Sequence, residues 1–122
     1  MDMVTLKADT EISQDQHDGL AHLRARISAC ADANGIVLEE TVKWGQPSFK
    51  ALNGTPVRIG TPKSGGFGLF VSCSSTVIAD YAATFEGRFD GNRGVLFESV
   101  AEAESQPLEM LLMRAFRYHE KP

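Results

Sequence analysis

The first half of the chain opens with a helical pattern of apolar residues. Between His17 and Gly35 these residues recur every three or four positions, which predicts one amphipathic helix. Ser13 and Gln16 have the spacing of a capping box at its start, and Asn34-Gly35 predicts its end. The apolar face consists of Leu20, Leu23, Ile27 and Cys30.

Strand-like patterns follow this helix. Residues 36–44 read IVLEETVKW; their β-branched residues favour a strand, although LEET also fits a helical turn. Beyond Pro47, Asn53-Gly54 predicts a hairpin with a type I′ turn. A second turn, TPKSGG, leads into FGLFVSC, so we expect a three-stranded antiparallel meander. The residues expected on the buried face of the hairpin are Phe49, Leu52, Val57 and Ile59.

The second half returns to helical spacing at both ends of a glycine-rich stretch. Residues 75–85 predict a helix with Ser75 as a candidate cap, residues 86–94 predict a loop, and VLFESV predicts a short strand. A closing helix follows, with Ser105 as its candidate cap and Pro107 in its first turn. Its core stripe is Leu108, Leu111, Leu112, Ala115 and Phe116.

This order of elements places the strands mostly in the middle of the chain. It predicts an α+β fold: a two-layer sandwich in which the N- and C-terminal helices cover one face of a mainly antiparallel sheet. The length of 122 residues fits a single domain, with residues 1–10 as a loose lead-in. The other face of the sheet is then polar, covered by loops, or used for binding.

Composition narrows the range of partners. A formal net charge of −4 argues against a nucleic-acid partner, which requires clustered Lys and Arg. Cys30 and Cys73 lack metal-ligand spacing and lie in apolar runs, so we interpret them as buried core residues. The chain shows neither a signal peptide nor a membrane-spanning run, which predicts a cytoplasmic protein with no membrane partner. The oligomeric state stays open.

Two loops carry the candidate binding chemistry. The stretch Trp44-Gly45-Gln46-Pro47-Ser48 is either a rigid corner or a pocket wall, with Trp44 as an apolar face and Gln46 as a hydrogen-bonding group. The glycine-rich stretch 86–94 carries arginines that suit a carboxylate or phosphate, unless Arg93 pairs with Glu86, Asp90 or Glu98 instead. The candidate ligand-binding residues are Trp44, Gln46, Ser48, Arg58, Arg88, Asn92 and Arg93.

Catalytic motifs are missing from the sequence. It contains no G-x-S-x-G, P-loop or dinucleotide fingerprint, and Cys73 with its neighbouring serines has no histidine close in sequence. We therefore predict no catalytic residues and favour a binding module over an enzyme. Asp18 and His22 are four residues apart and share a helix face, but two such residues are too few for a metal site.

Four segments carry a family resemblance. EETVKWGQPSF, PVRIGTPKSGGFGLFVSC, FDGNRGVLF and RAFRYH, in this order, resemble the YdhG-like domains of unknown function, which are related in fold to frataxin-like iron chaperones. The resemblance runs from about Leu20 to His119 and implies an α+β sandwich without a settled activity. Frataxin-like proteins use acidic residues of the first helix for iron. The corresponding residues here are Asp9, Glu11, Asp15, His17, Asp18 and His22.

Three functions follow as alternatives. The first is a non-enzymatic module that binds a small anionic ligand between the Trp44 loop and the arginine loop. The second is frataxin-like iron binding or delivery, with iron as the cofactor and Asp15, Asp18 and His22 as its ligands. The third is a protein–protein adaptor that uses the open sheet face or an edge strand.

Overall fold

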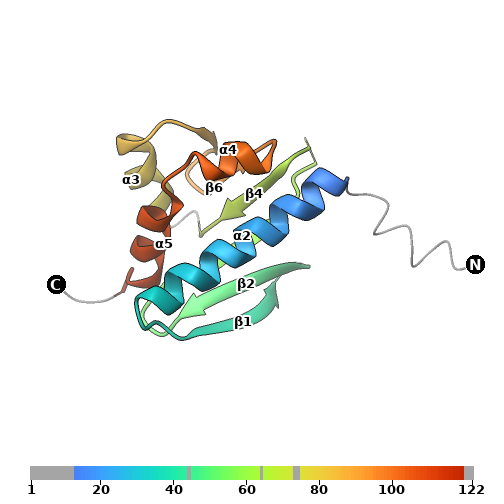
Figure 1. The fold of residues 1–122 in the computed structure, drawn as a ribbon. Helices are drawn as coiled ribbons and strands as arrows, with labels where there is room; N and C mark the ends of the chain where they lie inside the picture. The colour runs from blue at the N-terminus through green and yellow to red at the C-terminus, as the bar shows by residue number, and fades with distance from the viewer. Residues whose placement is uncertain (1–12, 44, 64, 73–74, 120–122) are drawn as a thin grey trace, which may run out of the picture.

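The computed structural model describes residues 13–43, 45–63, 65–72 and 75–119 (Figure 1). Its elements are helices packed on one side and strands of a single sheet. In chain order they are α2 (Gln14–Ala33), β1 (Leu38–Lys43), β2 (Gln46–Ala51), β3 (Val57–Gly60), β4 (Phe67–Phe70), α3 (Val77–Thr84), β5 (Arg88–Asp90), β6 (Gly94–Phe97), α4 (Val100–Glu104) and α5 (Leu108–Phe116).

Helix α2 forms where the sequence predicts it. The Ser13 hydroxyl accepts a hydrogen bond from the Gln16 N–H at 3.0 Å, and the Gln16 side chain accepts one from the Ser13 N–H at 2.8 Å. This reciprocal pair is the expected capping box. The helix ends at Asn34, whose side-chain amide donates to the Cys30 carbonyl. Leu23, Ile27 and Cys30 face the core, as predicted, while Leu20 is half-buried at its edge.

The six strands form one antiparallel sheet in the order β1-β2-β3-β4-β6-β5. The predicted meander is the run β2-β3-β4. The stretch LEET belongs to β1 and is not a helical turn. Lys43 is the register partner of Gln46, so a two-residue connection joins β1 to β2, and Gly45 adopts a φ of 75° there. A positive φ of this kind suits glycine at a tight hairpin.

The helices lie on one face of this sheet (Figure 1). Helix α2 packs against β3 and β4, α4 packs against β6, and α5 packs against α2 and α3. The predicted α+β sandwich is therefore confirmed. Between the two layers lie fully buried side chains that include Leu23, Phe67 and Phe97. Among the helices of the described residues, none is both long and apolar enough to cross a membrane.

Two details of the β2–β3 connection differ from the sequence prediction. Gly54 is not among the glycines with positive φ, so the type I′ turn is wrong, and five residues, 52–56, separate the strands. Leu52 is 88% exposed and is not part of the buried face. Gly54 is required for a different reason: a Cβ there would lie 2.5 Å from the carbonyl oxygen of Ala115. The adjacent Thr55 N–H donates to the same oxygen, so this loop packs on the end of α5.

The second half contains two elements that the pattern did not predict. Arg88–Asp90 is a strand, β5, rather than part of a loop. A short helix, α4, begins at Ser99, whose hydroxyl accepts a hydrogen bond from the Glu102 N–H. Ser105 therefore ends α4 and does not cap the closing helix. Pro107 immediately precedes that helix, α5, and its predicted core stripe from Leu108 to Phe116 is buried.

The predicted cap of α3 is also wrong. The N-cap residue is Thr76, and the Ser75 hydroxyl donates to the Ser72 carbonyl instead. The reason is local: the Ser75 N–H also donates to the Ser72 carbonyl, so both polar groups of Ser75 are directed to Ser72 and not to the start of α3.

Candidate functional site

The sheet face that the helices leave open is lined with glycine at its centre. Strand alternation turns Val57, Ile59, Leu69 and Val95 toward the core, which places Gly60, Gly68 and Gly94 on the opposite face. A Cβ on Gly94 would lie 2.5 Å from the Phe70 ring, and one on Gly60 would lie 2.2 Å from the Gln46 amide nitrogen. The glycines therefore let the two larger side chains lie close against the sheet.

A groove of about 620 Å³ opens on this face. Strands β2, β3, β4 and β5 and the two turns after β3 and β5 contribute to it. Phe70, only 8% exposed, supplies an apolar part of its wall. The lining residues are Gln46, Arg58, Pro62, Lys63, Phe70, Asp90 and Arg93. Three of them are cationic and one is anionic, so the groove carries a local positive charge on a chain whose net charge is negative.

Arg58 lies at the centre of this arrangement. It stands on β3, where Ser48 on β2 and Phe70 on β4 are its register partners. Its Nε is buried and has no hydrogen-bond partner. A buried donor without an acceptor is costly, so it marks a position where an acceptor from outside the chain would be bound favourably.

Arg93 reaches the groove from the β5–β6 turn. The Arg93 N–H donates to the Asp90 carbonyl at 3.1 Å, and Gly91 takes a φ of 55° within this turn. The Arg93 side chain donates from Nε to an Asp90 carboxylate oxygen at 3.2 Å. Of the three carboxylates that sequence offers to Arg93, the structure therefore selects Asp90. Both side chains remain partly exposed and line the groove.

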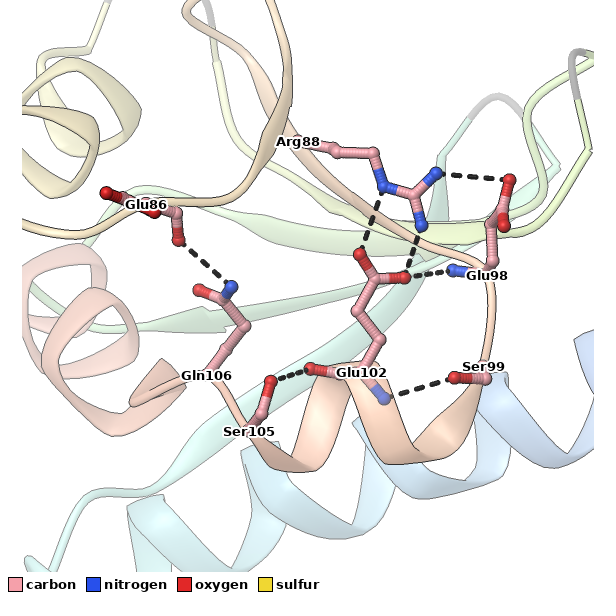
Figure 2. Close-up of polar contacts among 7 residues, drawn as sticks. All are labelled: Glu86, Arg88, Glu98, Ser99, Glu102, Ser105 and Gln106. Carbon is pink, nitrogen blue, oxygen red and sulfur yellow. Dashed lines mark hydrogen bonds and ion pairs between the residues drawn. The ribbon is translucent and has the colours of Figure 1, made fainter.

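Arg88 belongs to a different cluster (Figure 2). Its guanidinium lies between Glu98 and Glu102, with a Nη1–Oε2 distance of 3.1 Å to Glu98 and a Nε–Oε2 distance of 3.0 Å to Glu102. The hydrogen bonds from Arg88 hold the pKa of Glu102 below its usual range, and the two carboxylates raise the pKa of Arg88. Arg88 therefore ties β5 to the start of α4 and is not a groove residue.

The other predicted binding residues have mixed outcomes. Ser48 is 1% exposed and is not a lining residue of the groove, and Asn92 is exposed in the β5–β6 turn without lining it. Trp44 lies outside the described residues, so the predicted corner or pocket wall is described only through Gly45 and its neighbours. Because Gln46 and Arg93 line the same groove, the two loops singled out in the sequence do converge.

Sequence reasoning missed four lining residues: Pro62, Lys63, Phe70 and Asp90, the last of which was considered only as an ion-pair partner of Arg93. Lys63 lies in the turn directly after β3, the strand that holds Arg58. The predicted meander already places this turn next to that strand. Phe70 is two positions beyond Gly68 on β4 and thus shares its face. The alternation of residues along β4 indicates the face on which Phe70 lies. It does not give the strand register that pairs Phe70 with Arg58.

The residues proposed as iron ligands do not converge in the described part of the chain. No group of three or more His, Cys, Asp or Glu among those residues could hold a metal ion. Asp15 and Asp18 are exposed on the first turns of α2, where Asp18 accepts a hydrogen bond from Gln14. His22 is half-buried, and its Nε2 is buried without a partner. Asp9 and Glu11 lie outside the described residues.

The cysteines were interpreted as buried core residues. Cys30 is 5% exposed and has a free thiol, and burial raises the pKa of that thiol. A raised pKa keeps the thiol protonated and unreactive. Cys73 lies outside the described residues.

No model of a protein family, no curated protein and no solved structure matches this chain. The structure is an α+β domain with a cationic groove on its open sheet face. The resemblance to YdhG-like domains stays a prediction from the quoted motifs.

Proposed function

We propose that this protein is a non-enzymatic binding module for a small anionic ligand, held in the groove of the open sheet face. The single observation that carries the proposal is Arg58, whose Nε is buried in the groove region without a hydrogen-bond partner. A carboxylate or phosphate oxygen would satisfy this donor together with a terminal N–H of the same guanidinium, in the side-on geometry that arginine favours.

The surroundings of Arg58 support this role. Lys63 and Arg93 add positive charge, Gln46 offers an amide that both donates and accepts, and Phe70 offers an apolar wall. Binding sites for small molecules commonly combine apolar walls with a few convergent polar groups. The predictions that accompany this function are a cytoplasmic location and no nucleic-acid partner, and the mild acidic charge supports the second of them.

A titration followed by ¹H–¹⁵N NMR tests the proposal. Sodium phosphate is added at pH 7.5 while sodium chloride keeps the ionic strength constant. We expect saturable shifts of the amide signals of Gln46, Arg58 and Arg93. Arg58→Gln should abolish the saturation, whereas Arg117→Gln, which removes the same charge from the exposed end of α5, should preserve it.

Two results would overturn the proposal. One is a set of small linear shifts spread over the whole surface, which indicates general ion screening. The other is equal saturation in both variants.

A native mass that exceeds the denatured mass of the purified protein would identify a ligand that is carried through purification.

A further inference from the structure

We infer that the groove selects anions that carry two negative charges over anions that carry one. The inference rests on the proposed function and names the ligand class of that same site. It depends on how the charges around the groove are already compensated.

The groove contains three cations, and their compensation differs. Arg93 donates to Asp90 at 3.2 Å, so the charge of this pair is largely balanced within the chain. Arg58 and Lys63, in contrast, form no ion pair with any carboxylate of the described residues. The nearby Arg88 adds nothing to the groove, because Glu98 and Glu102 both bind it. Two positive charges are left for a ligand.

The surroundings of Arg58 and Lys63 determine how strongly these two cations attract an anion. The Nε of Arg58 is buried, and Phe70, its register partner on β4, is only 8% exposed and lines the same groove. Water is partly excluded there, so charge interactions are stronger than on an open surface. A monoanion satisfies Arg58 and leaves Lys63 uncompensated, while a dianion compensates both. The difference predicts at least about a fivefold preference for the dianion at moderate ionic strength.

Replacement of Asp90 tests the same reasoning by changing the charge of the groove instead of the charge of the ligand. Its carboxylate lines the groove and occupies Arg93, so it acts as a resident competitor for any incoming anion. Asp90→Asn would release Arg93 and raise the uncompensated charge from two to three. We expect the affinity for a dianion to rise by at least about threefold in this variant.

The experiment compares sulfate, which is a dianion, with nitrate, which is a planar monoanion. Both are titrated into the full chain at pH 8 and constant ionic strength, and dissociation constants are taken from the groove amides in ¹H–¹⁵N NMR spectra. Asp90→Asn is compared with Asp32→Asn, which removes the same charge from the exposed end of α2 on the helix-covered side. Asp32→Asn should bind sulfate like the parent chain.

The outcomes separate this inference from the function on which it rests. Saturable sulfate binding at the groove, at least about fivefold tighter than nitrate and strengthened only by Asp90→Asn, supports both. Equal binding of the two anions at the groove overturns the dianion selection and leaves the anion-binding function in place. Absence of saturation at the groove with either anion overturns both.

Methyl phosphate and succinate then identify the source of the two charges. Both are dianions at pH 8, but methyl phosphate presents its charge on one tetrahedral group and succinate on two separate carboxylates. Tighter binding of methyl phosphate assigns the site to phosphate monoesters, and tighter binding of succinate assigns it to dicarboxylates. Binding of both more weakly than acetate would overturn the selection of dianions.

Discussion

Replacement of Arg26 by Met is expected to destabilise the fold far more than the same change at Arg24, two residues earlier on α2. Arg26 connects α2 to the C-terminal helices. Its guanidinium donates to the carbonyls of Ala103 at 2.7 Å and Gln106 at 2.9 Å, and to both carboxylate oxygens of Glu109. Its side chain is only 16% exposed. Arg24 also binds a glutamate, Glu40, but both partners are about half-exposed.

The magnitude follows from these contacts. Each of the two part-buried carbonyls would lose its charged donor but keep a backbone one, the Gln106 N–H for Ala103 and the Leu108 N–H for Gln106. The cost is therefore that of one hydrogen bond each, about 1 kcal/mol, and not that of an unsatisfied acceptor. Loss of the partly exposed ion pair with Glu109 adds about 0.5–1 kcal/mol. The sum is about 3 kcal/mol, a large part of the roughly 5–15 kcal/mol that stabilises a typical domain. For Arg24→Met we expect about 1 kcal/mol or less, since the exposed pair and the contact with the Phe49 ring are each weak.

Urea denaturation followed by circular dichroism measures both free energies of unfolding. A third variant, Glu109→Gln, separates the two contributions, because it removes the negative charge but leaves an acceptor for Arg26. It should cost less than about 1 kcal/mol. If Arg26→Met proves no more costly than Arg24→Met, the carbonyl contacts do not stabilise the fold and the reasoning is refuted.

Further predictions concern the packing, the acid response and the exposed surface. Gly19→Ala should lower the free energy of unfolding by at least about 1 kcal/mol despite the better helix propensity of alanine, since its Cβ would lie 2.2 Å from the Phe67 ring. Adding Phe67→Leu to this variant should recover part of the loss. A single variant that is more stable than the parent chain would contradict this contact. Because the pKa of Glu102 is lowered in the folded state, its contribution is complete above the unfolded value of about 4.3 and disappears as the pH falls through the folded value. The stability difference between the parent chain and Glu102→Gln should therefore shrink from pH 6 to pH 3 in urea titrations, and a constant difference would argue against the role of its ionised form. Leu52→Ser should change the free energy of unfolding by less than about 0.5 kcal/mol, whereas Leu111→Ala should cost about 2–5 kcal/mol; similar effects of the two would contradict the assignment of Leu52 to the surface.

Local signals in the sequence predicted the parts of the fold that depend on neighbouring residues. The capping box of Ser13 and Gln16 and the core stripe of α5 are of this kind, because both depend on contacts within one helix. Helix α4 carried a comparable signal that was missed: Ser99 and Glu102 have capping spacing. Ser105 is an equally suitable capping residue by type, but in the structure it ends α4, and Pro107 precedes α5.

Contacts between distant segments account for the errors. Gly54 was interpreted as a turn residue, but its role depends on the end of α5, about 60 residues further along the chain. The groove shows the same limit. The chemistry of Arg58 and Arg93 indicates a site, whereas Phe70 requires the strand register. Arg88 was assigned to the site because its partner helix, α4, was not predicted.

The insertion of β6 between β4 and β5 has a consequence for how the chain folds during synthesis. A nascent chain that ends at Asp90 contains five of the six strands, yet β5 has no partner and β4 presents a free edge. The ribosome must therefore release residues beyond Phe97 before the sheet can close, and α5, which supplies much of the core, follows later still. We expect this domain to reach its native state only as its last third leaves the exit tunnel, with the β4 edge available to chaperones until then.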